Sequence, residues 1–197
     1  MKLLYYYCAG VMLCFFIACG GAKTPSPVAA TGNEVDSLDK NVASGKMKLS
    51  SPAFSSGDSI PRRYTGDGDD VSPELTWDEV PEGVRAFALI CSDPDAPLGT
   101  FIHWVVYNIP GESRRLPEAL PAKERFDDGT MQGVNSFRRI GYNGPKPPPG
   151  KPHRYFFRLY ALDCVLNLEP GAAAGKLQEA MTGHILAKAE MVGLYGR

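Results

Sequence analysis

Residues 85–91, 104–109 and 153–163 are three runs of apolar, β-branched and aromatic residues, each bounded by turn-forming residues. Runs of this composition predict β-strands, and the near-continuous apolar character of residues 85–91 predicts a strand that is covered on both faces. Prolines and glycines divide the rest of the chain into short segments joined by turns. The pattern therefore predicts a mainly β fold.

A helical period is confined to the C-terminal part of the chain. Three- and four-residue spacing with glycines on both sides predicts an amphipathic helix, and the recurring residues are Leu177, Ala180, Met181, His184, Ile185 and Lys188. His184 lies on the apolar stripe of this helix, so we interpret it as a core or interface residue rather than a ligand. Residues 110–149 show little regular period and are rich in Gly, Pro, Asn and Asp. Irregular segments of this length are usually functional.

A proline-stiffened acidic turn joins the first two runs. Residues 93–97 read Asp-Pro-Asp-Ala-Pro, and Pro94 restricts Asp93 to extended backbone angles. A histidine, His103, opens the returning strand. Because consecutive strands are usually neighbours, the carboxylates of Asp93 and Asp95 and this imidazole are expected at the same end of the sheet. That end is the candidate functional site.

The first 46 residues differ in composition from the remainder. Lys2 is followed by an uncharged apolar run and Cys19, which is the layout of an export signal. Residues 16–20 resemble a bacterial lipobox, in which the cysteine carries the lipid; an uncleaved membrane anchor and an ordinary cleaved signal are the alternatives. We therefore predict a signal peptide at 1–18, a tether rich in small residues at 19–46 and a domain at 47–197, lipid-anchored to the membrane in the bacterial cell envelope.

Charge and composition limit the classes of partner. The 197 residues carry a formal net charge of −1, which gives no basic field for nucleic acid. The 44% hydrophobic content is enough for one well-buried domain. The net charge and composition are compatible with a small ligand or another protein as the partner.

The residue types at the candidate site suit a small anion. His153 opens the third run, so His103 and His153 both stand at the start of a strand and face the same turn. Imidazoles that can be protonated, a tyrosine hydroxyl and backbone N–H groups near Gly144 are donors of the kind that bind phosphate. A lone carboxylate would repel phosphate, so we expect Asp93 to accept a hydrogen bond from one histidine and to orient it. Binding should then weaken as pH rises through the imidazole range.

Catalytic and metal-dependent functions have less support. No His-x-x-x-His or Cys-x-x-Cys pair is present, so the sequence predicts no metal site and no cofactor. A hydrolase built on Ser92, Asp93 and His103 lacks the Gly-x-Ser-x-Gly elbow, and strand neighbours point to opposite faces. Cys91 and Cys164 are predicted to be free thiols, because the strand order places them far apart. We therefore predict a protein that is not an enzyme.

Several motifs together carry a family resemblance. They are the Asp-Pro-Asp-Ala-Pro turn, a His-Trp strand that ends in Tyr-Asn-Ile-Pro, the stretch Gly-Pro-x-Pro-Pro-Pro-Gly-x-x-His-Arg-Tyr at residues 144–155, and a Gly-x-Tyr-Gly-Arg tail at residues 193–197. In these features the chain resembles the phosphatidylethanolamine-binding protein family, also called Raf kinase inhibitor-like proteins, over residues 47–197. The match is with the bacterial branch of the family.

The resemblance implies two packed sheets with Greek-key connections, C-terminal helices and one small anion pocket. Relatives bind phosphate-like groups, including phospholipid headgroups, and some inhibit kinases or proteases. Bacterial relatives often have Cys at the positions of Gly66 and Lys146; here Lys146 would add positive charge near the pocket mouth. The expected ligand-binding residues are Asp93, Asp95, Pro97, His103, Gly144, Pro145, His153 and Tyr155. The expected function is anion or headgroup binding, with inhibition or regulation of an envelope protease or kinase as the alternative.

Overall fold

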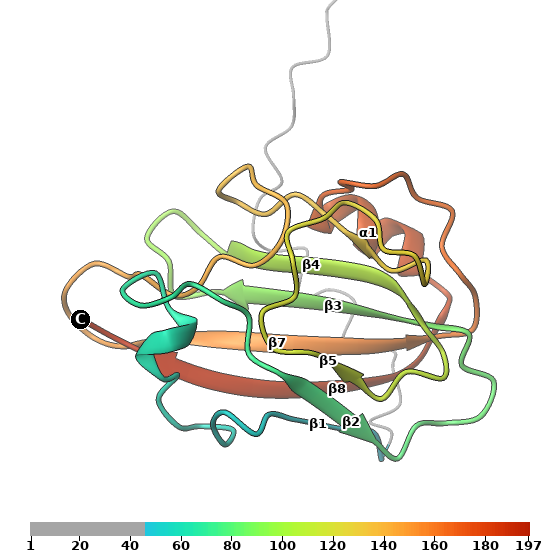
Figure 1. The fold of residues 1–197 in the computed structure, drawn as a ribbon, viewed down its shortest axis with the longest axis horizontal. Coiled ribbons are helices and arrows are strands. Elements are labelled where there is room, and N and C mark those ends of the chain that lie inside the picture. The colour runs from blue at the N-terminus through green and yellow to red at the C-terminus, as the bar shows by residue number, and fades with distance from the viewer. Residues whose placement is uncertain (1–45) are drawn as a thin grey trace, which may run out of the picture.

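The computed structural model describes residues 46–197, which form two antiparallel β-sheets and one α-helix (Figure 1). The larger sheet has the strand order β6-β4-β3-β7-β8, and the smaller has the order β1-β2-β5. The strands are β1 (Lys48–Ser50), β2 (Leu75–Asp78), β3 (Ala86–Asp93), β4 (Phe101–Pro110), β5 (Arg115–Leu116), β6 (Met131–Gln132), β7 (His153–Leu162) and β8 (Ile185–Tyr195). A 3₁₀ turn, Arg62–Tyr64, precedes β2. The predicted mainly β, two-sheet fold is confirmed.

Three predictions lie outside the described residues. They are the signal peptide at 1–18, the lipidation of Cys19 and all of the tether except its last residue. Within residues 46–197, no helix is long enough and apolar enough to span a bilayer.

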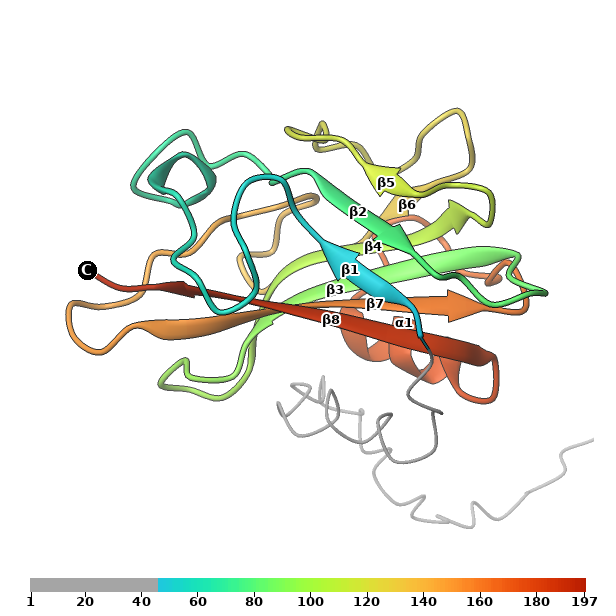
Figure 2. The same cartoon turned by 90° about the horizontal axis from the view of Figure 1, so that it is seen from below.

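The larger sheet is covered on both faces. Figure 2 shows β1, β2 and β5 on one side of it and the helix α1 (Ala174–Met181) on the other. Every residue of β3 is buried, with Leu89 facing the smaller sheet and Ile90 facing the helix layer, where Leu177 packs. The near-continuous apolar run predicted this double burial, because neither face of the strand meets water.

The predicted C-terminal helix is too long. It ends at Met181, and Ile185 and Lys188 belong to β8, which pairs with β7 over nearly its whole length. Side chains on β8 alternate in burial from Ala187 onward, as expected of a strand. Its alanines favour helix intrinsically, but pairing with β7 overrides that preference. His184 is therefore an exposed residue of the turn before β8, and its prediction as a core residue is wrong.

The three central strands meet at one end of the larger sheet, beside the C-terminus in Figure 1. β3 ends at Asp93 and pairs there with Phe101 of β4, while His153 begins β7. The ladder between β3 and β4 slips by one residue: Cys91 pairs with Trp104, and Ser92 pairs with Ile102. His103 is the extra residue of this β-bulge. Bulges re-aim side chains and are common beside functional sites.

Candidate functional site

A cavity of about 190 Å³ lies at this end of the sheet. It receives side chains from the turn after β3, from the first residues of β4 and β7, and from the loop before β7. Its lining residues are Asp93, Ala96, Pro97, Phe101, His103, Phe137, Lys146, Pro147, Pro148, His153 and Tyr155. The cavity combines two imidazoles, one carboxylate, one ammonium and one phenol within an otherwise apolar wall.

Asp93 and His153 form a shielded pair in the cavity. Nδ1 of His153 lies 2.8 Å from Oδ2 of Asp93, and the other carboxylate oxygen accepts the backbone N–H of Asp95 at 2.8 Å. A carboxylate can only accept, so Nδ1 carries the proton of this bond and Nε2 is left for other partners. Asp93 thus accepts a hydrogen bond from one histidine, and that histidine is His153.

His103 is held differently. Its Nδ1 donates to the backbone carbonyl of Asn143 at 2.6 Å, and its ring lies between the rings of Phe101, Phe137 and Tyr155, at centroid distances of 5.2–5.6 Å. Burial lowers the pKa of His103 below its usual value, and this outweighs the opposing effect of the hydrogen bond to Asn143. Burial therefore favours the neutral form of His103, in which Nδ1 donates to Asn143 and Nε2 is able to accept a hydrogen bond. The positive charge predicted for His103 near neutrality stays a prediction, and burial of the ring acts against it.

Tyr155 and Lys146 complete the polar wall. Burial, then the negative charge of Asp93 and, to a smaller degree, a hydrogen bond with Asp93 raise the pKa of Tyr155, so its hydroxyl stays protonated. The ammonium of Lys146 donates to the carbonyl of Gly66 at 3.0 Å and lies 3.5 Å from Asp67. Positions 66 and 146 are direct neighbours, since a Cβ on Gly66 would lie 3.1 Å from the Cβ of Lys146.

Three predicted site residues do not line the cavity. Asp95 makes a two-pronged ion pair with Arg154, at 2.7 and 2.9 Å, and this hydrogen bonding lowers the pKa of Asp95 to about 2. The backbone N–H of Gly144 donates to Asp70 at 2.6 Å, so it is not free for a ligand. Pro145 turns its carbonyl to the N–H of Gly66. Asp93, Pro97, His103, His153 and Tyr155 do lie in the wall.

Sequence reasoning missed the aromatic part of the wall. Phe101 lies two residues before His103, at the bulge. Phe137 comes from the long irregular segment and follows His103 by 34 residues in the sequence. Asp70 was also missed: it accepts from both Asn143 and Gly144 and so fixes the loop that holds His103. No local motif connects these residues, because loop packing alone brings them together.

Ser92 does not line the cavity that contains Asp93 and His103. Ser92 is fully buried and its hydroxyl accepts from Arg158 at 3.4 Å, away from His103. Among residues 46–197, one group of three metal-ligating side chains is close enough to share an ion, and it lies at the opposite end of the sheet. Cys91 is buried within β3, and Cys164 follows the far end of β7; both are free thiols.

Comparisons with known proteins agree with this fold. Over about 150 residues the chain is 52% identical to a UPF0098 protein of Methanothermobacter thermautotrophicus, covering 77% of this chain and 99% of that one. It is 49% identical to a UPF0098 protein of Aquifex aeolicus, covering 77% and 89% of the two chains.

Solved structures are similar over the same region. The phosphatidylethanolamine-binding protein homologue CT736 of Chlamydia trachomatis is 41% identical with a TM-score of 0.71, and E. coli YbcL, described as a new member of the mammalian PEBP family, is 31% identical with a TM-score of 0.71. Each covers 78% of this chain and 99% of its own. The model of the family named phosphatidylethanolamine-binding protein matches residues 50–196, and the chain belongs to this family.

Proposed function

We propose that this chain is a non-catalytic binding protein whose cavity takes a small anion, either free phosphate or the phosphate of a phospholipid headgroup. The observation that carries the proposal is the Asp93–His153 pair at 2.8 Å beside the hydroxyl of Tyr155, inside a cavity of about 190 Å³. A volume of this order suits a headgroup-sized ligand rather than a long acyl chain.

The two histidines have different tasks in this proposal. Asp93 holds the Nδ1 proton of His153, so a protonated His153 offers its Nε2–H to the anion as a charge-assisted donor. The hydroxyl of Tyr155 supplies a neutral donor. The neutral His103 supplies an acceptor, which suits a ligand that carries a proton of its own, such as the hydroxyl of a phosphate monoanion or the ammonium of an ethanolamine headgroup.

Calorimetric titration of the full chain with inorganic phosphate, and separately with glycerophosphoethanolamine, tests this function. Replacing Asp93 by Ala should weaken binding of phosphate about ten- to a hundredfold, since the orienting partner of His153 is lost. The matched control is Asp95→Ala, whose side chain lies outside the cavity and should leave affinity unchanged. Tighter phosphate binding by Asp93→Ala would contradict the orienting role and favour a cationic ligand.

The two ligands also separate the sources of the anion. Tighter binding of glycerophosphoethanolamine than of phosphate favours a lipid headgroup, and equal binding favours free phosphate. The titrations need correction for the ionisation of phosphate itself.

A second candidate is inhibition or regulation of an envelope protease or kinase. It is favoured by apolar side chains around the cavity: Leu98 is fully exposed, Phe137 is 41% exposed, and Pro147 and Pro148 form part of the wall. Exposed apolar groups of this kind are typical of protein contacts. Replacing Leu98 by Ser should reduce capture of such a partner and leave phosphate affinity unchanged.

Export and lipid anchoring form part of the proposal. The support is the apolar run that ends in Ala-Cys-Gly at residues 18–20. Intact-mass measurement on membrane fractions should find a diacyl or triacyl increment on a chain that begins at Cys19. An unmodified mature chain that begins elsewhere would contradict it.

A further inference from the structure

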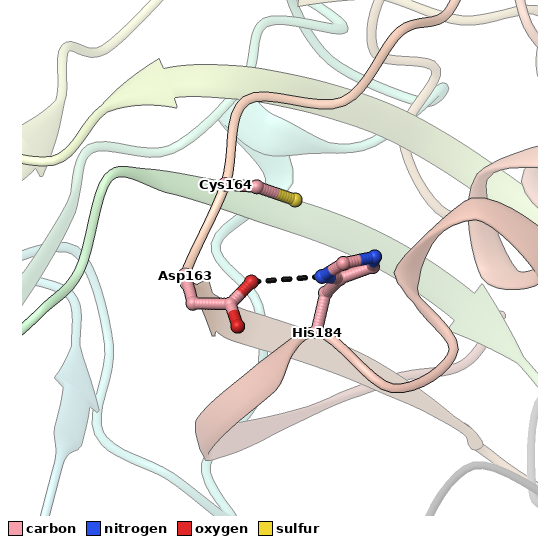
Figure 3. A group of neighbouring side chains, drawn as sticks. All are labelled: Asp163, Cys164 and His184. Atoms are coloured by element: carbon pink, nitrogen blue, oxygen red, sulfur yellow. Dashed lines mark hydrogen bonds and ion pairs between the residues drawn. The ribbon is translucent and has the colours of Figure 1, made fainter.

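The end of the sheet opposite the cavity carries a second group of chemically active side chains. Asp163 and Cys164 directly follow β7, and His184 directly precedes β8 (Figure 3). One donor atom from each residue lies within 4.8 Å of the other two. From this geometry we propose that Asp163, Cys164 and His184 bind a zinc-like divalent cation.

The backbone holds the three residues in place without the cation. Leu162 and Ile185 are paired across β7 and β8, immediately before Asp163 and immediately after His184. The N–H of Asp163 donates to the carbonyl of His184 at 3.1 Å, and Nδ1 of His184 lies 2.8 Å from Oδ1 of Asp163. The strand register therefore sets the separation of the donors, and only side-chain rotation is needed to close the site.

The donor atoms fit a tetrahedral cation after a small adjustment of the side chains, in which the 2.8 Å contact between Nδ1 of His184 and Oδ1 of Asp163 opens. Zinc bonds to sulfur, nitrogen and oxygen are about 2.0–2.3 Å, so tetrahedral donors lie roughly 3.3–3.7 Å apart. The present separations are within about an ångström of that range. The side chains of His184 and Asp163 are 47% and 46% exposed, so they can move at little cost and a cation can reach them from solvent.

The donor set selects the kind of cation. A thiolate, an imidazole and a carboxylate together suit Zn²⁺ and similar borderline-soft ions, whereas Mg²⁺ and Ca²⁺ favour oxygen ligands throughout. Three protein ligands leave a fourth position for water. Binding releases the thiol proton of Cys164 to solvent, because the thiolate is the ligand form.

A cysteine nucleophile is the competing interpretation of the same three residues. It requires a thiol that is activated by a lowered pKa. Here burial and the charge of Asp163 raise the pKa of Cys164, which is the opposite of activation.

Zinc titration by calorimetry tests the site in a full chain with serine at positions 8, 14 and 19, which leaves Cys91 and Cys164 as its cysteines. We expect one Zn²⁺ per chain at this site and at least a tenfold loss of affinity in Cys164→Ser. The matched control is Val165→Ser, which changes the exposed neighbour and keeps all three donors. Equal Zn²⁺ affinity in Cys164→Ser and the parent chain overturns the proposal.

Two further measurements distinguish zinc binding at these three residues from zinc binding elsewhere on the chain. Zn²⁺ should slow the alkylation of Cys164 by iodoacetamide, a readout that needs no substitution; an unchanged rate overturns the proposal. His153→Gln, which alters the cavity at the other end of β7, should keep the Zn²⁺ affinity of the parent chain. Loss of zinc binding in that variant would assign the ion to the cavity and overturn the proposal.

Discussion

The two ends of β7 carry the same pair of residue types in different surroundings. At one end Nδ1 of His153 lies 2.8 Å from Asp93, and just past the other end Nδ1 of His184 lies 2.8 Å from Asp163. The side chains of the first pair are 14% and 5% exposed, whereas those of the second are 47% and 46% exposed. The two histidine–aspartate pairs therefore share the same contact and differ in their burial and in the side chains around them.

The comparison teaches that a histidine–carboxylate contact alone does not define a function. Beside Asp93 and His153 lie a tyrosine hydroxyl and a neutral imidazole in an enclosed wall, which suits orientation of a proton toward a ligand. Beside His184 lies the partly buried thiol of Cys164, which suits a cation. Matched substitutions at the two ends test whether this difference in surroundings has measurable effects.

The largest expected difference in stability loss between the two ends is that between Asp93→Ala and Asp163→Ala. Asp93→Ala leaves the N–H of Asp95 and Nδ1 of His153 without their acceptor in a buried site, at a cost of about 2–4 kcal/mol of unfolding free energy. Asp163→Ala, without added metal, breaks an exposed pair and should cost less than about 1 kcal/mol. Urea denaturation measures both. Equal losses would mean that burial does not separate the two ends.

Two glycines give the next largest difference. A Cβ on Gly144 would lie 2.3 Å from the carbonyl oxygen of Tyr64, so Gly144→Ala forces backbone to shift and should cost about 3 kcal/mol. Gly183, beside His184, has open space around it, and Gly183→Ala meets only the strain of its φ of +82°, about 1–2 kcal/mol. Thermal denaturation of both variants checks the order. A larger loss in Gly183→Ala would contradict the close packing of the loop that holds His103.

The smallest expected effect is a pH dependence at the cavity end. Burial lowers the pKa of His103 in the folded chain below its usual 6.5, so the unfolded chain binds the proton more readily. The stability that the neutral imidazole contributes is complete above pH 6.5 and is lost as pH falls from 6.5 toward the lowered pKa. His103→Gln should flatten this part of the stability profile. Denaturant titrations between pH 7 and 5 measure the unfolding free energy. If its dependence on pH is the same in His103→Gln as in the unsubstituted chain, His103 does not cause this loss of stability.

The sequence predicted those parts of the fold that depend on continuous burial. The runs at residues 85–91, 104–109 and 153–163 became β3, β4 and β7, because strands covered on both faces need apolar residues at every position. β8 was not predicted because two of its buried positions, Ala187 and Ala189, are alanines, which favour helix when the sequence is read locally. Its strand conformation comes from pairing with β7.

The candidate site was predictable in part, where local motifs carry it. The acidic turn and the two histidines indicated a carboxylate that orients an imidazole, and Asp93 does bond to His153. The bulge that brings His103 into the cavity leaves no mark in a single sequence, since it is a one-residue slip of the ladder. The use of the Gly144 N–H by Asp70, 74 residues away, depends equally on tertiary packing.

Phosphate titration of His153→Gln and His184→Gln is the most direct test of anion binding at the Asp93–His153 end of β7, because each substitution removes one of the two matched imidazoles. The full chain with His153→Gln should bind inorganic phosphate about ten- to a hundredfold more weakly than the unsubstituted chain, because one charge-assisted donor is lost. His184→Gln should bind phosphate as the unsubstituted chain does. Equal affinities in the two variants would contradict the assignment of anion binding to the shielded end of β7.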